Sequence, residues 1–258
     1  MSVTLAFSET GSGPPLVILH GLFGSKRNWS SLAGKLAARR RVFTVDLRNH
    51  GASPWDPRHD YPALADDVAD LIQRHVGGPA AVIGHSMGGK AAMMLALTRP
   101  ELVERLVVVD IAPAPSNAGT FDVLRTLQAV PLAGMTRRAE VEAALVASSV
   151  EPAVAAFLAQ NVASGPEGRL AWTINLDALD RHAADILGFP EPPAGVRFEK
   201  PTLFIAGGRS DYLRPEHRPV IERLFPSAAF ETIEQAGHWV HAEAPGPFLE
   251  TVTRFLEG

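Results

Sequence analysis

The chain has 258 residues, of which 46% are hydrophobic and 20% are charged, with a net charge of −4 and no cysteine. This length and hydrophobicity allow a large buried core, which excludes intrinsic disorder and fits one domain that carries an insertion. The weak negative charge argues against nucleic-acid binding, and the lack of cysteine excludes disulfides, thiolate metal sites and a cysteine nucleophile.

The first residues, Met1 to Glu9, contain no basic segment followed by an apolar stretch, so we expect no signal peptide. No apolar run approaches the roughly 18 residues that a membrane span requires, so we expect no membrane insertion. Because a cysteine-free chain suits a reducing compartment, we expect the protein in the cytoplasm. Nothing in the sequence specifies an oligomeric state.

Short β-branched or aliphatic runs alternate with longer helical patterns along the chain. This alternation predicts an α/β fold with a mostly parallel sheet and crossover helices, and continuous apolar runs suit strands covered on both faces. The predicted strands are Pro15–Leu19, Val42–Val45, Ala80–Ile83, Leu106–Val109, Thr202–Ile205 and a weaker Ala229–Ile233. Apolar residues at helical spacing predict helices over Tyr61–His75, Gly89–Leu97 and Pro247–Leu256.

Residues 116–195 break this alternation, because they show helical stretches and no convincing strand. The apolar stripes that predict these helices are Phe121, Leu124, Leu127 and Val130, then Val154, Phe157 and Leu158, then Trp172, Leu176 and Leu179. An all-helical insertion between two strands predicts a cap over the carboxyl ends of the strands, where open α/β sheets bind ligands. We therefore expect a core of residues 1–115 and 196–258 and a helical cap of residues 116–195.

The segment Gly84–Gly88 reads Gly-His-Ser-Met-Gly and lies between a predicted strand and a predicted helix. This context is typical of a nucleophile elbow, in which a strained turn exposes a serine hydroxyl, here that of Ser86. The same stretch, extended to Lys90, also fits the phosphate-binding P-loop pattern. Ala91 then stands where the magnesium-binding hydroxyl is needed, so we favour the elbow.

Two further loops fit a serine hydrolase. The glycine-rich loop 20–25 follows the first predicted strand, and its Leu22 N–H, together with the Met87 N–H, would form the oxyanion hole. The chain order Ser, acid, His places the base last, at His238 after the final strand. His238 and His241 could also form a metal pair, but no carboxylate cluster accompanies them, so we expect no metal. His59 lies in a polar context typical of a surface.

With three motifs in order, the chain resembles the α/β-hydrolase superfamily over essentially its whole length. The closer likeness is to small bacterial esterases and their mitochondrial α/β-hydrolase-domain relatives. It is carried by the segments His20–Ser25, Asp46–Gly51, Gly84–Lys90, Val109–Pro113 and Gly237–Glu243. The resemblance implies an α/β-hydrolase fold with a helical cap, esterase activity on short acyl chains and no cofactor.

Two carboxylates are candidates for the triad acid. Asp110 ends a predicted strand, and in the branch that the chain resembles an acid in this motif orients the histidine. Asp211 follows the strand Thr202–Ile205, which is the commoner acid position in the superfamily at large. We favour Asp110 and keep Asp211 as the alternative, since one acid suffices to hold the imidazole in one tautomer.

These residues predict a serine carboxylesterase that hydrolyses short- to medium-chain acyl esters of a small-molecule substrate through an acyl-enzyme on Ser86. Phe23, Trp172 and Trp239 are the predicted substrate-binding side chains, although Trp172 could equally pack inside the cap. Thioesterase, lactonase, C–C hydrolase and perhydrolase activities would use the same triad. A hydrolase-fold receptor with slow turnover is a hypothesis from a different class of protein.

Overall fold

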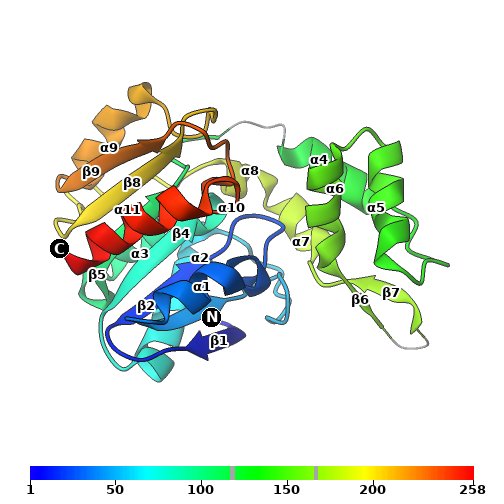
Figure 1. The fold of residues 1–258 in the computed structure, drawn as a ribbon, viewed down its shortest axis with the longest axis horizontal. Coiled ribbons are helices and arrows are strands. Elements are labelled where there is room, and N and C mark those ends of the chain that lie inside the picture. The colour runs from blue at the N-terminus through cyan, green and yellow to red at the C-terminus, as the bar shows by residue number, and fades with distance from the viewer. Residues whose placement is uncertain (117–119, 166–167) are drawn as a thin grey trace.

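The computed structural model describes residues 1–116, 120–165 and 168–258. Its centre is a seven-stranded sheet in the order β1-β3-β2-β4-β5-β8-β9 (Figure 1). β1 pairs antiparallel with β3, and the other neighbouring strands of this sheet are parallel, which confirms the predicted fold class. The strands are β1 (Phe7–Thr10), β2 (Pro15–Leu19), β3 (Arg41–Val45), β4 (Ala80–His85), β5 (Val103–Val109), β8 (Thr202–Gly207) and β9 (Ala228–Ile233).

Helices cover both faces of the sheet because its central strands are apolar on both sides. In β2, Val17 and Leu19 join the core on one face, whereas Leu16 and Ile18 join the core on the other. The first core takes buried residues from α2 (Tyr61–Leu71), α3 (Met87–Thr98) and α9 (Arg218–Leu224). The second takes them from α1 (Ser30–Leu36), α10 (Val240–Glu243) and α11 (Pro245–Glu257). None of the helices described here combines the length and apolar character needed to cross a membrane.

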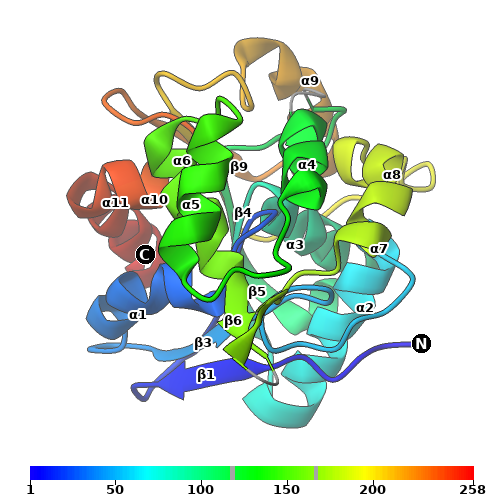
Figure 2. The same cartoon turned by 90° about the vertical axis from the view of Figure 1, so that its right-hand side faces the viewer.

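The segment between β5 and β8 projects from one end of the sheet, as Figure 1 shows and as Figure 2 views end-on. Its helices are α4 (Thr120–Ala129), α5 (Arg138–Ala147), α6 (Pro152–Leu158), α7 (Leu176–Arg181) and α8 (Ala183–Leu187). Residues 117–119 and 166–167 of the predicted cap lie outside the described residues. The division of the chain into a core and a cap at residues 116 and 195 stays a prediction.

Two strands were missing from the predicted elements of this segment. β6 (Val162–Ser164) and β7 (Leu170–Trp172) form an antiparallel ribbon within a stretch that we expected to be helical or irregular. Each strand has three residues, which is too short for alternating hydrophobicity to show in the sequence. Trp172 therefore belongs to a strand and not to a helical stripe with Leu176 and Leu179.

Candidate active site

The Ser86 hydroxyl stands at the sharp turn that joins strand β4 to helix α3. Ser86 has φ 52° and ψ −119°, a backbone conformation that residues with a side chain rarely adopt. Its N–H donates to the carbonyl oxygen of Val109 at 3.0 Å, which ties the turn to the neighbouring strand β5. Strain of this kind is held in place by the surrounding structure and is found preferentially at functional sites.

The glycines of the Gly-His-Ser-Met-Gly segment are required by close packing. A Cβ on Gly84 would lie 2.3 Å from the carbonyl oxygen of Gly88, and a Cβ on Gly88 would lie 2.4 Å from that of His20. A side chain at either position would force strand, helix and loop apart. Lys90, the residue that suggested a P-loop, is buried and donates to the carbonyl oxygens of Leu187 and Gly188.

His238 is hydrogen-bonded to both Ser86 and Asp110. Its Nε2 lies 3.1 Å from Ser86 Oγ, and its Nδ1 lies 2.7 Å from Asp110 Oδ2. The ring of Tyr212 stacks on the imidazole with centroids 3.9 Å apart, and His85 donates from Nε2 to the His238 carbonyl oxygen at 2.9 Å. The orientation of His238 is thus set by hydrogen bonds at both ring nitrogens, by stacking on one face of the ring and by a hydrogen bond to its backbone carbonyl.

The carboxylate of Asp110 is fully buried at the end of β5. Its Oδ1 accepts the Gly207 N–H at 2.9 Å, and its Oδ2 accepts the Ser210 hydroxyl besides facing His238. Asp211, the alternative acid, is exposed and forms no hydrogen bond or ion pair within the described part of the chain. The structure therefore brings Asp110 to the imidazole and leaves Asp211 outside this hydrogen-bonded set.

Two buried histidines hold the loop that follows β2. His20 bonds the Gly21 carbonyl oxygen through Nδ1 at 2.7 Å and accepts the Leu47 N–H at Nε2. His50 likewise bonds the Arg48 carbonyl oxygen through Nδ1 and accepts the Phe23 N–H at Nε2. Burial lowers the pKa of His20 and lowers that of His50 to about 3, so both rings are neutral near pH 7.

This loop reaches close to Ser86. A Cβ on Gly21 would lie 2.8 Å from His85 Nδ1 and 3.3 Å from the Ser86 Cβ, so glycine at this position avoids a clash with the His85 ring. Met87 is the first residue of α3, and its N–H therefore has no acceptor inside the helix. Leu22, Ser86 and Met87 all line one small cavity, so the two residues whose N–H groups are the predicted oxyanion donors border the same space as Ser86.

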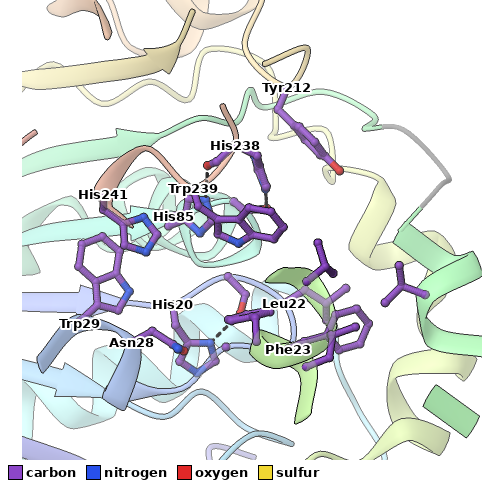
Figure 3. Close-up of a pocket in the computed structure, with 17 residues that line it drawn as sticks. His20, Leu22, Phe23, Asn28, Trp29, His85, Tyr212, His238, Trp239 and His241 are labelled. Atoms are coloured by element: carbon purple, nitrogen blue, oxygen red, sulfur yellow. Dashed lines mark hydrogen bonds between the residues drawn. The ribbon is translucent and has the colours of Figure 1, made fainter. Parts of the chain in front are cut away.

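A cavity of about 330 Å³ has Ser86 and His238 in its wall (Figure 3). Leu22 and Phe23 lie across it from Tyr212 and His238, and the stacked rings of Trp29 and His241 close one end. Two of the three predicted substrate-binding side chains, Phe23 and Trp239, line this cavity. The inserted segment supplies the remaining apolar wall, from Val123, Val154, Phe157 and Leu158.

Trp172 does not line this cavity. It pairs with Val162 in the β6–β7 ribbon and packs, partly buried, against the main hydrophobic core. His59 also differs from the expectation of a surface residue, because it is fully buried with Nε2 3.3 Å from Met87 Sδ. Tyr212 contacts His238 and Ser210 contacts Asp110, and neither was predicted as a site residue. The only signal in the sequence is that both residues are adjacent to Asp211, the alternative acid.

No set of three or more potential metal-ligating side chains is found among residues 1–116, 120–165 and 168–258. His241 lines the large cavity, but its Nδ1 atom is buried and has no hydrogen-bond partner among the described residues. Burial lowers the pKa of His241 to about 3, which keeps this ring neutral beside the proposed base.

The fold and the strained serine turn define a hydrolase of the α/β class, and comparison with known proteins agrees. A family model described as the alpha/beta hydrolase fold matches residues 14–245. The chain belongs to this family.

Its relatives include named esterases and lipases. The sn-1-specific diacylglycerol lipase ABHD11 of Mus musculus is 43% identical over 94% of this chain and 81% of its own length. Esterase YbfF of Escherichia coli (strain K12) is 36% identical over 94% of this chain and 92% of its own length. A solved structure of a marine microorganism esterase is 33% identical, with a TM-score of 0.94 over 98% of this chain and all of that chain. The predicted likeness to small esterases and their α/β-hydrolase-domain relatives is confirmed.

Proposed function

We propose that the chain is a serine carboxylesterase that hydrolyses short- to medium-chain acyl esters through an acyl-enzyme on Ser86. The observation that carries the proposal is the hydrogen-bonded series from Ser86 Oγ through His238 to Asp110, at the wall of an apolar cavity. A nucleophile, a base within hydrogen-bond reach and a carboxylate that orients the base are the parts that acyl transfer requires.

The chain is an ester-hydrolysing enzyme, since it has the hydrolase fold and its relatives include proteins named esterase and lipase. Thioester, lactone and peracid chemistry would use the same three side chains, and a receptor of this fold would keep them with little turnover. We choose carboxylic esters because the relatives' names point to ester bonds. The volume of the cavity, about 330 Å³, suits a small to medium-sized apolar ester.

In the first half of the reaction, Ser86 Oγ attacks the ester carbonyl carbon while His238 Nε2 takes the hydroxyl proton. The carbonyl oxygen gains negative charge, and we assign its stabilisation to the N–H groups of Leu22 and Met87. His238 then gives its proton to the alcohol oxygen as the carbon–oxygen bond breaks. The alcohol leaves, and the acyl group stays as an ester on Ser86.

In the second half, His238 takes a proton from a water molecule that attacks the acyl carbon. The carboxylic acid leaves as the proton passes back to Ser86 Oγ. Asp110 keeps its charge throughout, because its role is to hold the Nδ1–H tautomer and to stabilise the imidazolium that forms. Its accepted bonds from Gly207 N–H and Ser210 hold the carboxylate in the orientation that this role needs.

In this proposal, residues 116–195 act as a cap that supplies apolar walls, and residues 1–115 and 196–258 supply the chemistry. Val154, Phe157 and Leu158 of the inserted segment face the same cavity as Ser86 and His238. We place the reaction in the cytoplasm, since a chain without cysteine suits a reducing compartment.

The test compares wild type with Ser86→Ala on p-nitrophenyl acetate and p-nitrophenyl butyrate. We expect the substitution to lower kcat by about 10³- to 10⁶-fold, because the residual rate then depends on binding and the oxyanion donors alone. Ser164→Ala, which changes an exposed serine of β6, is the matched control and should leave kcat unchanged. Equal rates for wild type and Ser86→Ala on both esters would contradict the proposal.

A further inference from the structure

Two cavities of very different size meet at Ser86. The large cavity, of about 330 Å³, has both Ser86 and His238 in its wall. The small cavity, of about 30 Å³, has Ser86 and Met87 in its wall, whereas His238 is absent from the described residues that line it. The proposed oxyanion residue Leu22 borders both cavities.

The position of His238 determines which side of an ester each cavity can hold. The imidazole must reach the alcohol oxygen to protonate it as it leaves, so the alcohol has to lie on the side of His238. The oxyanion points to the N–H groups of Leu22 and Met87. The acyl chain takes the third direction from the tetrahedral carbon, away from His238, and the small cavity is the space at Ser86 that has no His238 in its described lining.

We propose that the small cavity is the acyl subsite, that it admits acyl groups of about two or three carbons, and that the large cavity holds a bulky apolar alcohol. This inference rests on the proposed esterase function and narrows its substrate class. A space of about 30 Å³ corresponds to about two water molecules, which is close to the size of a methyl or ethyl group.

The far wall of the small cavity is held by buried polar contacts. Ile186 and Leu187 of α8 form part of this wall. The Tyr61 hydroxyl donates to the Ile186 carbonyl oxygen at 2.6 Å, and Lys90 Nζ donates to the carbonyl oxygens of Leu187 at 2.7 Å and Gly188 at 2.8 Å. Lys90 Nζ also lies 3.2 Å from Ser116 Oγ, so it joins the two ends of the inserted segment.

These contacts make the small cavity rigid. The side chains of Tyr61 and Lys90 are almost fully buried. A shift of α8 would break their hydrogen bonds and leave the donors and the carbonyl acceptors buried without partners, which is costly in free energy. A longer acyl chain therefore cannot push the wall outward cheaply. The outer wall of the large cavity consists instead of apolar side chains such as Phe157, whose ring lies 5.9 Å from that of Trp239.

The experiment uses two isomeric esters, hexyl acetate and ethyl hexanoate, which have the same composition and exchange the sizes of the acyl and alcohol parts. We expect wild type to hydrolyse hexyl acetate with a kcat/KM at least about tenfold above that of ethyl hexanoate, measured by pH-stat titration. Equal values, or a preference for ethyl hexanoate, would overturn the subsite assignment.

A variant links the preference to the wall of the small cavity. Ile186→Ala enlarges that cavity and should shift the ratio of the two kcat/KM values toward ethyl hexanoate by about tenfold. Leu176→Ala removes a buried side chain from the neighbouring helix α7, which lines neither cavity, and should leave the ratio unchanged. An unchanged ratio in a folded Ile186→Ala protein would overturn the assignment.

The two proposals fail in different ways. If wild type and Ser86→Ala turn over p-nitrophenyl acetate and butyrate equally slowly, the esterase function is wrong and the subsite assignment falls with it. If wild type hydrolyses these esters in a Ser86-dependent manner but prefers ethyl hexanoate to hexyl acetate, the esterase function stands and only the subsite assignment is wrong.

Discussion

The walls around Ser86 come from two regions that are built in different ways. The loops at the carboxyl end of the sheet are held by buried hydrogen bonds, and Phe23, Asn49, Ser86 and Asp110 in these loops have positive φ angles. The inserted segment contributes short helices with apolar side chains toward the cavity and exposed residues on the opposite faces. In the sheet loops, directional hydrogen bonds and a strained backbone set the positions of individual polar atoms. In the inserted segment, apolar packing sets the shape of the cavity wall and not the position of any one atom.

This difference predicts two kinds of response to substitution. Changes in the sheet loops should act on turnover or on folding, because each polar partner or glycine there has no substitute of equal geometry. Changes in the inserted segment should act on KM and on substrate preference, because apolar walls tolerate rearrangement.

Asp110→Asn should lower kcat by about 10⁴-fold, because an amide in place of the carboxylate favours the wrong imidazole tautomer. Asp211→Asn is the matched control and should change kcat by less than about threefold, since Asp211 is exposed and forms no hydrogen bond with any described residue. Steady-state hydrolysis of p-nitrophenyl acetate measures both. Similar small losses in the two variants would contradict the assignment of Asp110 as the acid.

Gly88→Ala should destabilise the fold by about 1–3 kcal/mol, because its Cβ would meet the carbonyl oxygens of His20 and Leu19 at 2.4 and 2.7 Å. Gly78→Ala provides the control, since a Cβ there would have no heavy atom within 4 Å. Urea unfolding measures the free energy of unfolding of each variant. A Gly88→Ala protein as stable as Gly78→Ala would show that the loop after β2 moves aside at little cost in free energy, which would contradict a rigid, hydrogen-bonded region around Ser86.

The sequence was most informative where the backbone is under the tightest constraint. The six predicted strands of the main sheet agree with β2, β3, β4, β5, β8 and β9. The first five are mostly buried and appear as continuous apolar runs, whereas β9 is a partly exposed edge strand and gave the weaker pattern. The edge strand β1 (Phe-Ser-Glu-Thr) was not predicted, since it is mostly exposed and has no such run. The G-x-S-x-G pattern indicated the serine turn for the same reason, as its glycines are fixed by close contacts.

Side-chain neighbours across the fold were less predictable. The stacking of Tyr212 on His238 and the bond from Ser210 to Asp110 depend on how the loop after β8 folds back toward β5. Periodicity reports only which face of an element is buried, and it says nothing about such loop contacts. Trp172 lies in a strand of three residues, which is too short to show a periodic pattern. The flanking sequence therefore did not predict that its side chain packs against the core and not in the cavity.

Lys90 offers a pH test at the junction of the two regions. Burial lowers its pKa to about 7, whereas an unfolded lysine stays protonated to about pH 10.4. Between these values the unfolded state binds more protons, so this group makes the free energy of unfolding rise with pH, by at most about 1.4 kcal/mol per pH unit. We expect the stability of wild type relative to Lys90→Met to rise from pH 7 to pH 9 in urea unfolding. A difference independent of pH would contradict this expectation.

Phe157→Ala should raise KM for hexyl acetate about fivefold and leave kcat within about twofold, because it removes an apolar contact that binds ground state and transition state alike. Trp172→Leu truncates an aromatic residue in the same inserted segment that does not line the large cavity, so its KM should stay near the wild-type value. Initial rates over a range of hexyl acetate concentrations separate the two parameters. If Phe157→Ala instead lowers kcat with KM unchanged, the inserted segment helps to position the reacting atoms, and the division between a chemical region and a shape-setting region fails.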